Sequence, residues 1–121
     1  MEACTSYILY KELIIPENSK LLEAAKRYVD AHLSESVSVE SLCAELHIGR
    51  TKLYELFRRE LNTGVSKYIL KRRMHQAKKL IRTTDRSIAD IAAAVGFSDY
   101  NYFGKVFKRV YGRSPKSYRS A

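Results

Sequence analysis

The sequence predicts an all-α protein made of two helix-turn-helix subdomains, with about seven helices. Three observations support this prediction. Apolar residues recur at spacings of three and four through most of the chain, cap residues begin several of these segments, and the second half repeats the pattern of the first. Only residues 5–15 fit a strand as well as a frayed helix. With 45% hydrophobic and 29% charged residues, the 121-residue chain has the composition of one globular domain or two small subdomains.

Three helices are expected in the first half. One spans residues 20–33 behind an N-cap at Ser19. A helix of about two turns begins after Ser38 and ends near His47, and a third follows and ends near Leu61. Their buried stripes are apolar residues at helical spacing: Leu22, Ala25, Val29 and Leu33, then Val39, Leu42, Cys43 and Leu46, then Leu53, Leu56 and Phe57.

Four helices are expected in the second half. Residues 66–82 form a joining helix of roughly 25 Å at about 1.5 Å per residue. After a loop at 83–86, helices follow over 87–95 and 98–111, and the last begins at Pro115, whose fixed φ suits the first helical position. The inward residues of the helix at 98–111 are expected to be Phe103, Val106, Phe107 and Val110.

This pattern divides the chain into four parts. Residues 1–19 are a tail or the remnant of a preceding segment, and residues 20–65 are the first helix-turn-helix subdomain. Residues 66–82 are the linker helix, and residues 83–121 are the second subdomain. Within the linker helix, Arg73 is expected to have a structural role, bridging the two subdomains.

The two subdomains repeat each other. Ser38, Leu42 and Leu46 match Ser87, Ile91 and Val95 at an offset of 49 positions, and Leu53 and Phe57 match Phe103 and Phe107 at an offset of 50. Each copy needs a turn residue in an unusual backbone conformation, supplied by Gly96 in the second copy and by His47 in the first. The second helix of each copy then presents an unpacked face to a major groove.

The distribution of charge indicates a polyanionic partner. Residues 1–49 carry 4 basic and 8 acidic groups, residues 50–82 carry 11 and 2, and residues 83–121 carry 7 and 3, for a net charge of +9. Nucleic acid is the first candidate. Charge alone is equally compatible with a solvated basic face that keeps the protein soluble.

Other protein classes find little support in the sequence. No apolar run approaches the roughly 20 residues that cross a bilayer, and no secretion signal is present, so a cytoplasmic protein without membrane contact is expected. An enzyme is not expected, because His32, His47 and His75 are scattered and no phosphate loop or triad is present. Cys43 and His47 are half a zinc site at most, so neither a metal nor a cofactor is expected.

Two further interpretations remain open from the residues alone. One is a non-specific nucleic-acid-binding or membrane-surface helical module, and the other is a protein adaptor. Neither explains two matched second helices at a fixed offset. We therefore favour a sequence-specific binder of duplex DNA that regulates transcription.

A family resemblance is carried by Ser87-Ile88-Ala89-Asp90-Ile91-Ala92, Val95-Gly96-Phe97-Ser98-Asp99, Tyr102-Phe103, Val106-Phe107-Lys108, Tyr111-Gly112, Ser114-Pro115 and Tyr118-Arg119. With these residues, the chain from about Lys20 to Ser120 resembles the DNA-binding domain of the AraC/XylS family of bacterial transcription regulators. The resemblance implies a monomeric reading unit whose two recognition helices enter successive major-groove segments on one face of DNA. This sequence departs from the family at His47, where Gly is usual, and at Gly104 inside the second reading helix.

The family resemblance also bears on partners. Members often carry a ligand-binding domain before the reading unit, which is compatible with a chain that is a fragment of a longer, dimeric regulator. An activator of this kind would also have RNA polymerase as a partner. The operator, the effector and the direction of regulation have no signature in these residues.

The candidate base contacts are outward residues that match the family's base-contacting positions. Arginine and lysine donate to guanine, asparagine pairs with adenine, glutamate accepts from cytosine, and threonine or tyrosine packs on a thymine methyl. Glu55 has the alternative of pairing with Arg58 or Arg59, and both tyrosines have the alternative of an edge-of-core position. The set comprises Arg50, Thr51, Tyr54 and Glu55 in the first reading helix, and Tyr100, Asn101 and Lys105 in the second.

The candidate phosphate contacts are cations near the reading helices and residues at helix N-termini. Free amides at a helix N-terminus and the positive end of the helix dipole both favour an anion. The set comprises Ser38, Arg58, Lys67, Ser87, Lys108 and Lys116.

Overall fold

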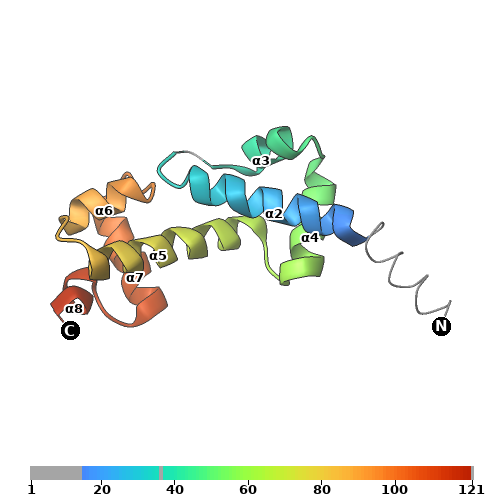
Figure 1. Ribbon diagram of the computed structural model, residues 1–121. Coiled ribbons are helices and arrows are strands. Elements are labelled where there is room, and N and C mark those ends of the chain that lie inside the picture. The colour runs from blue at the N-terminus through green and yellow to red at the C-terminus, as the bar shows by residue number, and fades with distance from the viewer. Residues whose placement is uncertain (1–14, 36, 121) are drawn as a thin grey trace. The chain divides into compact units, whose positions relative to one another are not determined.

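The computed structural model describes residues 15–35 and 37–120, which form seven helices and no strand, so the all-α prediction is confirmed (Figure 1). Of the segment 5–15, only Ile15 lies inside the described residues. None of the described helices is long and apolar enough to span a bilayer. The helices are α2 (Ile15–Ala31), α3 (Val39–Leu46), α4 (Arg50–Leu61), α5 (Val65–Thr83), α6 (Ile88–Ala94), α7 (Tyr100–Tyr111) and α8 (Pro115–Ser120).

The described residues group into two compact units. Unit 1 lies within Met1–Tyr28 and Ser38–Val65, and unit 2 lies within Val29–Val37 and Ser66–Ala121. The segment 29–37, which the sequence pattern had grouped with the first helix-turn-helix, therefore clusters with unit 2. Two arginines of α5 hold it there. Arg72 binds the carboxylate of Asp30 at 2.8 and 3.2 Å, and Arg73 donates to backbone carbonyls of this segment.

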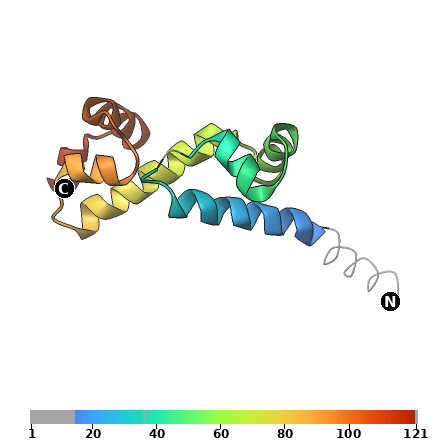
Figure 2. The same cartoon turned by 90° about the horizontal axis from the view of Figure 1, so that it is seen from above.

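Unit 1 contains the first helix-turn-helix, in which α3 lies beside α4 (Figures 1 and 2). Ser38 caps α3 as predicted: its Oγ accepts from the amide of Ser41 at 3.0 Å, and Ser41 Oγ accepts from the amide of Ser38 at 2.9 Å. Such a reciprocal pair satisfies two amides that have no partner inside the helix. His47 ends α3 in the left-handed conformation, with φ 56°. Of the expected inner residues, Leu42, Leu46, Leu53, Leu56 and Phe57 are buried, whereas Val39 and Cys43 are half-buried.

Unit 2 contains the second helix-turn-helix and an aromatic core. Ser87 caps α6, since its Oγ accepts from the amide of Asp90 at 3.0 Å. The ring of Phe107 lies 4.7 Å from that of Tyr111 and 5.7 Å from that of Tyr118, which ties α7 to α8. The buried cluster consists of Met74, Ala77, Ile81, Ile91, Ala92, Val95, Phe103, Val106 and Phe107.

Two predicted helix starts are wrong. α2 already includes Ile15, so Ser19 lies inside the helix and is not its N-cap. α7 begins at Tyr100 with Asp99 as its N-cap, two residues later than predicted. The carboxylate of Asp99 accepts from two consecutive amides at 2.9 and 3.2 Å, so it satisfies more of the helix terminus than a hydroxyl at Ser98 would.

Val110 was expected to face inward, and this is also wrong, because its side chain is 48% exposed. The inner stripe of α7 follows a four-residue step from Phe103 through Phe107 to Tyr111. Tyr111 takes the inner place in the last turn and packs on Tyr118, at 6.2 Å between ring centroids. Val110, about 100° away around the helix, is left on its flank.

Candidate nucleic-acid interface

The outward face of α4 is polar and open to solvent. Arg50, Thr51, Tyr54 and Glu55 are all exposed, because Leu53, Leu56 and Phe57 take the inner side of the helix. The side chain of Tyr54 is 46% exposed, which places it outside the core. A shallow hollow of about 540 Å³ on this face is lined by Tyr54, Glu55, Arg58 and Arg59.

Arg50 is held within unit 1 rather than left free. Its guanidinium pairs with the carboxylate of Glu40, in the first turn of α3. A hydrogen bond with Tyr54, followed by the charge of Glu40, raises the pKa of Arg50. Backbone hydrogen bonding at the helix N-terminus, followed by the charge of Arg50, lowers the pKa of Glu40. The first reading helix thus begins with an arginine already bound to a carboxylate, a contact that the sequence analysis did not anticipate.

Glu55 does not form the ion pair that was its alternative. Neither Arg58 nor Arg59 lies within ion-pair distance of its carboxylate in the part of the chain that the structure describes. Arg58 and Arg59 lie in the last turn of α4, where a positive charge is favourable beside the carbonyl end of the helix. Glu55 therefore remains a free acceptor on the outward face.

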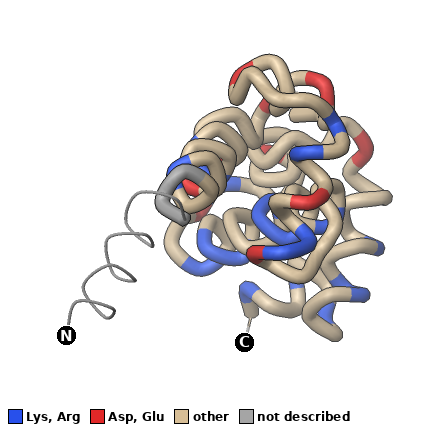
Figure 3. Tube along the Cα trace, turned by 90° about the vertical axis from the view of Figure 1, so that its right-hand side faces the viewer, with Lys and Arg blue, Asp and Glu red and all other residues tan. Residues whose placement is uncertain are grey.

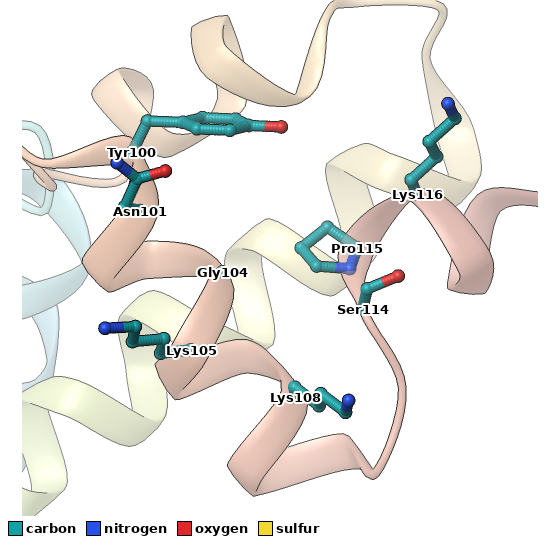
Figure 4. Close-up of a pocket in the computed structure, with 8 residues that line it drawn as sticks. All are labelled: Tyr100, Asn101, Gly104, Lys105, Lys108, Ser114, Pro115 and Lys116. Carbon is teal, nitrogen blue, oxygen red and sulfur yellow. The ribbon is translucent and has the colours of Figure 1, made fainter.

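The outward face of α7 borders a hollow within unit 2. Tyr100, Asn101, Lys105 and Lys108 come from α7, and Ser114, Pro115 and Lys116 come from the start of α8 (Figure 4). The hollow measures about 490 Å³, and Gly104 lies at its edge. Tyr100 is 51% exposed and is not among the residues packed on the core cluster. Both reading-helix tyrosines thus point outward.

The candidate phosphate contacts are either cap residues at helix N-termini or exposed cations. Ser38 and Ser87 cap α3 and α6, so each lies at a helix N-terminus; Ser87 is exposed and Ser38 is half-buried. The other four candidates, Arg58, Lys67, Lys108 and Lys116, are exposed cations. Over the traced chain, Lys and Arg positions outnumber Asp and Glu positions (Figure 3).

Much of the positive charge of α5 is used inside unit 2. The Nζ of Lys78 lies 5.1 Å from the centre of the Tyr111 ring, and the guanidinium of Arg82 lies 4.9 Å from that of Tyr118. Both are cation–π contacts. Together with the pairing of Arg72 and Asp30, these contacts show that a basic run in a helix is a poor guide to groove contacts.

Arg73 has a structural role, as predicted, but its hydrogen bonds lie within unit 2 and do not bridge the two units. Its guanidinium donates to the carbonyl oxygens of Leu33, Val95 and Glu35, the last two at 2.6 and 3.2 Å. Burial lowers the pKa of Arg73. All three carbonyls belong to unit 2, so these bonds join segments within that unit.

Arg119 makes a similar set of contacts, and the sequence analysis did not single it out. It donates to the carbonyls of Ile81, Thr84 and Arg86 at 3.1, 3.1 and 2.6 Å. These carbonyls end α5 and its following loop, where helix geometry leaves acceptors without partners. The planar guanidinium, with five donors, suits such a cluster.

Nothing among the described residues suggests metal chemistry. Cys43 is half-buried and free, and no group of three or more potential metal ligands occurs in this part of the chain. The interface therefore has two components: two polar helix faces and the cations around them.

Comparison with known proteins identifies the family. A family model described as a helix-turn-helix domain matches residues 42–121. A solved transcriptional regulator with an AraC-type DNA-binding domain, from Chromobacterium violaceum, superimposes with a TM-score of 0.80 at 28% identity, covering 87% of this chain and 94% of that one. The chain belongs to the AraC/XylS family. It is a helix-turn-helix domain of a family of DNA-binding transcription regulators, which are not enzymes.

Relatives of this AraC/XylS domain include complete regulators. It is 36% identical over 104 residues to the regulatory protein PocR of Salmonella typhimurium, covering 86% of this chain and 34% of that protein. It is 34% identical to the arabinose operon regulatory protein of Escherichia coli, covering 87% of this chain and 36% of that protein. The chain thus spans about a third of the length of these relatives.

One similar structure was solved with DNA. The DNA-binding domain of the global transcriptional factor AdpA, in complex with a target DNA, aligns with a TM-score of 0.76 at 29% identity. The alignment covers 83% of this AraC/XylS domain and 89% of that chain.

Proposed function

We propose that this AraC/XylS domain binds duplex DNA sequence-specifically by placing α4 and α7 in two successive segments of the major groove. The observation that carries the proposal is the repeat of one arrangement at two places in the chain. In each copy a capped short helix precedes a helix whose inner face is apolar and whose outer face is exposed and polar. This is the arrangement that helix-turn-helix proteins use to read base edges.

The proposed base contacts come from those outer faces. On α4 they are Arg50 and Glu55 as hydrogen-bonding groups, with Thr51 and Tyr54 packing on thymine methyls. On α7 they are Tyr100, Asn101 and Lys105. The side chain of Arg50 must leave Glu40 to reach a guanine.

The proposed phosphate contacts fix the register of the domain without reading sequence. Ser38 and Ser87 offer helix N-termini, and the exposed cations Arg58, Lys67, Lys108 and Lys116 neutralise phosphate charge. Residues 50–121 carry a net charge of +13, so affinity will be strongly electrostatic.

The functional division we propose follows the repeat. Residues 20–65 and 83–121 each read one block of the site, and residues 66–82 join them. Because both reading helices lie on one chain in head-to-tail order, one copy binds an asymmetric site. Its two blocks are centred about 10 to 11 base pairs apart, one turn of duplex.

In the whole regulator, this domain would act beside other parts. The similarity to the arabinose operon regulatory protein suggests that the domain directs a longer regulator to an operon, and we propose that this regulator is cytoplasmic and dimeric at full length. For an activator, RNA polymerase would be the protein partner. No membrane partner is proposed.

The experiment is a selection of bound sequences from random duplexes with the wild-type chain, Arg50→Ala and Lys105→Ala. Each variant should lose preference in a different block, by about 1 to 3 kcal/mol per good base contact. Lys116→Ala is the matched control, because it should weaken binding to all sequences alike. Affinity should fall by about 10³ to 10⁵ between 50 and 200 mM salt if on the order of 6 to 10 phosphates are contacted.

Three results would contradict the proposal. They are a palindromic site bound only by dimers, loss of preference at the same base pairs in both variants, and a salt-independent affinity. Equal binding to duplex DNA, duplex RNA and anionic vesicles would instead indicate a non-specific basic module.

A further inference from the structure

Gly104 occupies the fifth position of α7, where the free protein gives no reason for a glycine. Its φ is not positive, and a Cβ built there would meet nothing within 4 Å. Gly96 is different, because its φ is +96° and an added Cβ would collide with Arg73 and the Leu33 carbonyl. A glycine in the middle of a helix lowers helix stability relative to alanine. The fold therefore does not require the residue at 104.

Gly104 lies at the centre of the outward face of α7. Tyr100 and Lys108 are one helical turn before and after it, and all three border the 490 Å³ hollow. Figure 4 shows the Tyr100 ring extending over this hollow and Pro115 facing α7 across it, while Gly104 contributes no side chain. The lining is thus two rings and lysine side chains, together with the polar side chains of Asn101 and Ser114.

The first reading helix, α4, carries a large side chain at the position equivalent to Gly104. At the offset of 50 positions, Tyr54 of α4 corresponds to Gly104 of α7. Tyr54 is 46% exposed and interacts with Arg50, so its ring occupies the middle of that outward face. At this position the two reading helices therefore differ: α4 carries an aromatic ring there, and α7 carries no side chain.

We infer that Gly104 is a specificity-determining residue, and that the hollow beside it accepts the C5 methyl of a thymine. This inference rests on the proposed binding of duplex DNA. The thymine methyl is the apolar group that base pairs display in the major groove, and a hollow lined by two rings matches it. A side chain at position 104 would keep the base edge at a distance from the helix backbone.

The test begins with the site that the wild-type chain selects from random duplexes. Each thymine in that site is then replaced singly by uracil, which removes the methyl and leaves the hydrogen-bonding edge unchanged. One thymine in the block read by α7 should show a loss of about 4-fold in affinity, the value of one buried methyl-sized group. Gly104→Ala should bind the thymine duplex about 4-fold more weakly and should no longer distinguish thymine from uracil there.

Thermal melting separates this effect from a folding defect. Gly104→Ala should melt at the same temperature as the wild type or higher, because alanine favours the helix and nothing obstructs its methyl. Ala93→Gly, at an exposed position of α6, is the matched control. It should lower the melting temperature and leave the ratio of thymine to uracil affinity unchanged.

Different results would overturn the inference alone or the proposed function as well. A wild-type chain that selects a site but shows no methyl dependence in the α7 block overturns this inference alone. So does a Gly104→Ala variant with unchanged affinity and an unchanged thymine-to-uracil ratio. A wild-type chain without any sequence preference overturns both the proposed function and the inference.

Discussion

The two helix-turn-helix copies place different residues at the turn position that has a positive φ. The turn after α3 is made by His47 at φ 56°, and the turn after α6 is made by Gly96 at φ +96°. Space around His47 is open, and its side chain is exposed. At Gly96 the Leu33 carbonyl and the guanidinium of Arg73 fill the place where a Cβ would lie. A positive φ alone tolerates a histidine, whereas a positive φ beneath a packed arginine requires glycine.

Gly96→Ala should have the largest effect on this comparison. The methyl would strain the backbone and displace Arg73 from its carbonyls, so we expect a loss of about 3 kcal/mol or more in the free energy of unfolding. Chemical denaturation measures it. Gly64→Ala is the matched control, since its φ is not positive and a Cβ there meets nothing within 4 Å. Equal losses of unfolding free energy in Gly96→Ala and Gly64→Ala would show that the positive φ and the packing at Gly96 do not require glycine.

Arg73→Met should rank second. Methionine keeps an apolar stem but has no donors, which leaves the carbonyls of Leu33, Glu35 and Val95 without this partner. We expect a loss of about 2 kcal/mol in the free energy of unfolding. Arg72→Met, which removes an exposed pair with Asp30, should cost clearly less. If Arg72→Met lowers the free energy of unfolding as much as Arg73→Met does, the carbonyl contacts of Arg73 are not the cause of the loss.

Glu40→Ala tests a second difference between the copies, because Ala89 stands in the second copy where Glu40 stands in the first. The change frees Arg50 and removes a negative charge near DNA phosphates. Affinity for the selected duplex should rise about 3-fold at low salt, and less as salt increases. Glu45→Ala removes the same charge from α3 without touching Arg50 and should raise affinity less. A fall in affinity would mean that Glu40 positions Arg50 for binding.

His47→Gly should have the smallest effect. Glycine relieves the left-handed strain but makes the unfolded chain more flexible, so the two terms nearly cancel. Stability should stay unchanged or rise by less than about 0.5 kcal/mol, measured by thermal melting. A loss above about 1 kcal/mol would show that the imidazole contributes a contact of its own.

Periodicity and capping were sufficient to predict most of the fold. The stripe of α4 and the residues Leu22, Ala25 and Val29 of α2 are buried as expected, because helical spacing determines which residues share a face. In α3 only Leu42 and Leu46 of the expected stripe are buried, and Val39 and Cys43 are half-buried. The start of α7 was not predictable to the residue, because Ser98 and Asp99 are both good caps and only three-dimensional geometry decides between them. Val110 was misplaced because the pattern does not show that Tyr118 of α8 packs on Tyr111 of α7.

The candidate site was predictable in outline. Once the inner residues of α4 and α7 are assigned, their exposed residues follow by elimination, and the structure places them outward. The side chains or carbonyls that such residues contact could not be predicted from the sequence. The pairing of Arg50 with Glu40 joins different helices, and the carbonyl contacts of Arg119 depend on how α5 ends. A basic residue in a sequence reveals its charge but not whether it meets a carboxylate, a carbonyl, a ring or solvent.

The interleaving of the two units limits how this protein can be recombined. A chimaera cut between residues 65 and 66 would take α5 to α8 from one parent and the segment 29–37 from the other. Arg73 would then meet the carbonyls of a foreign connection, and Arg72 would meet a foreign residue in place of Asp30. An exchange of the second reading module should therefore carry residues 29–37 with it. A module defined by packing need not be a continuous stretch of gene.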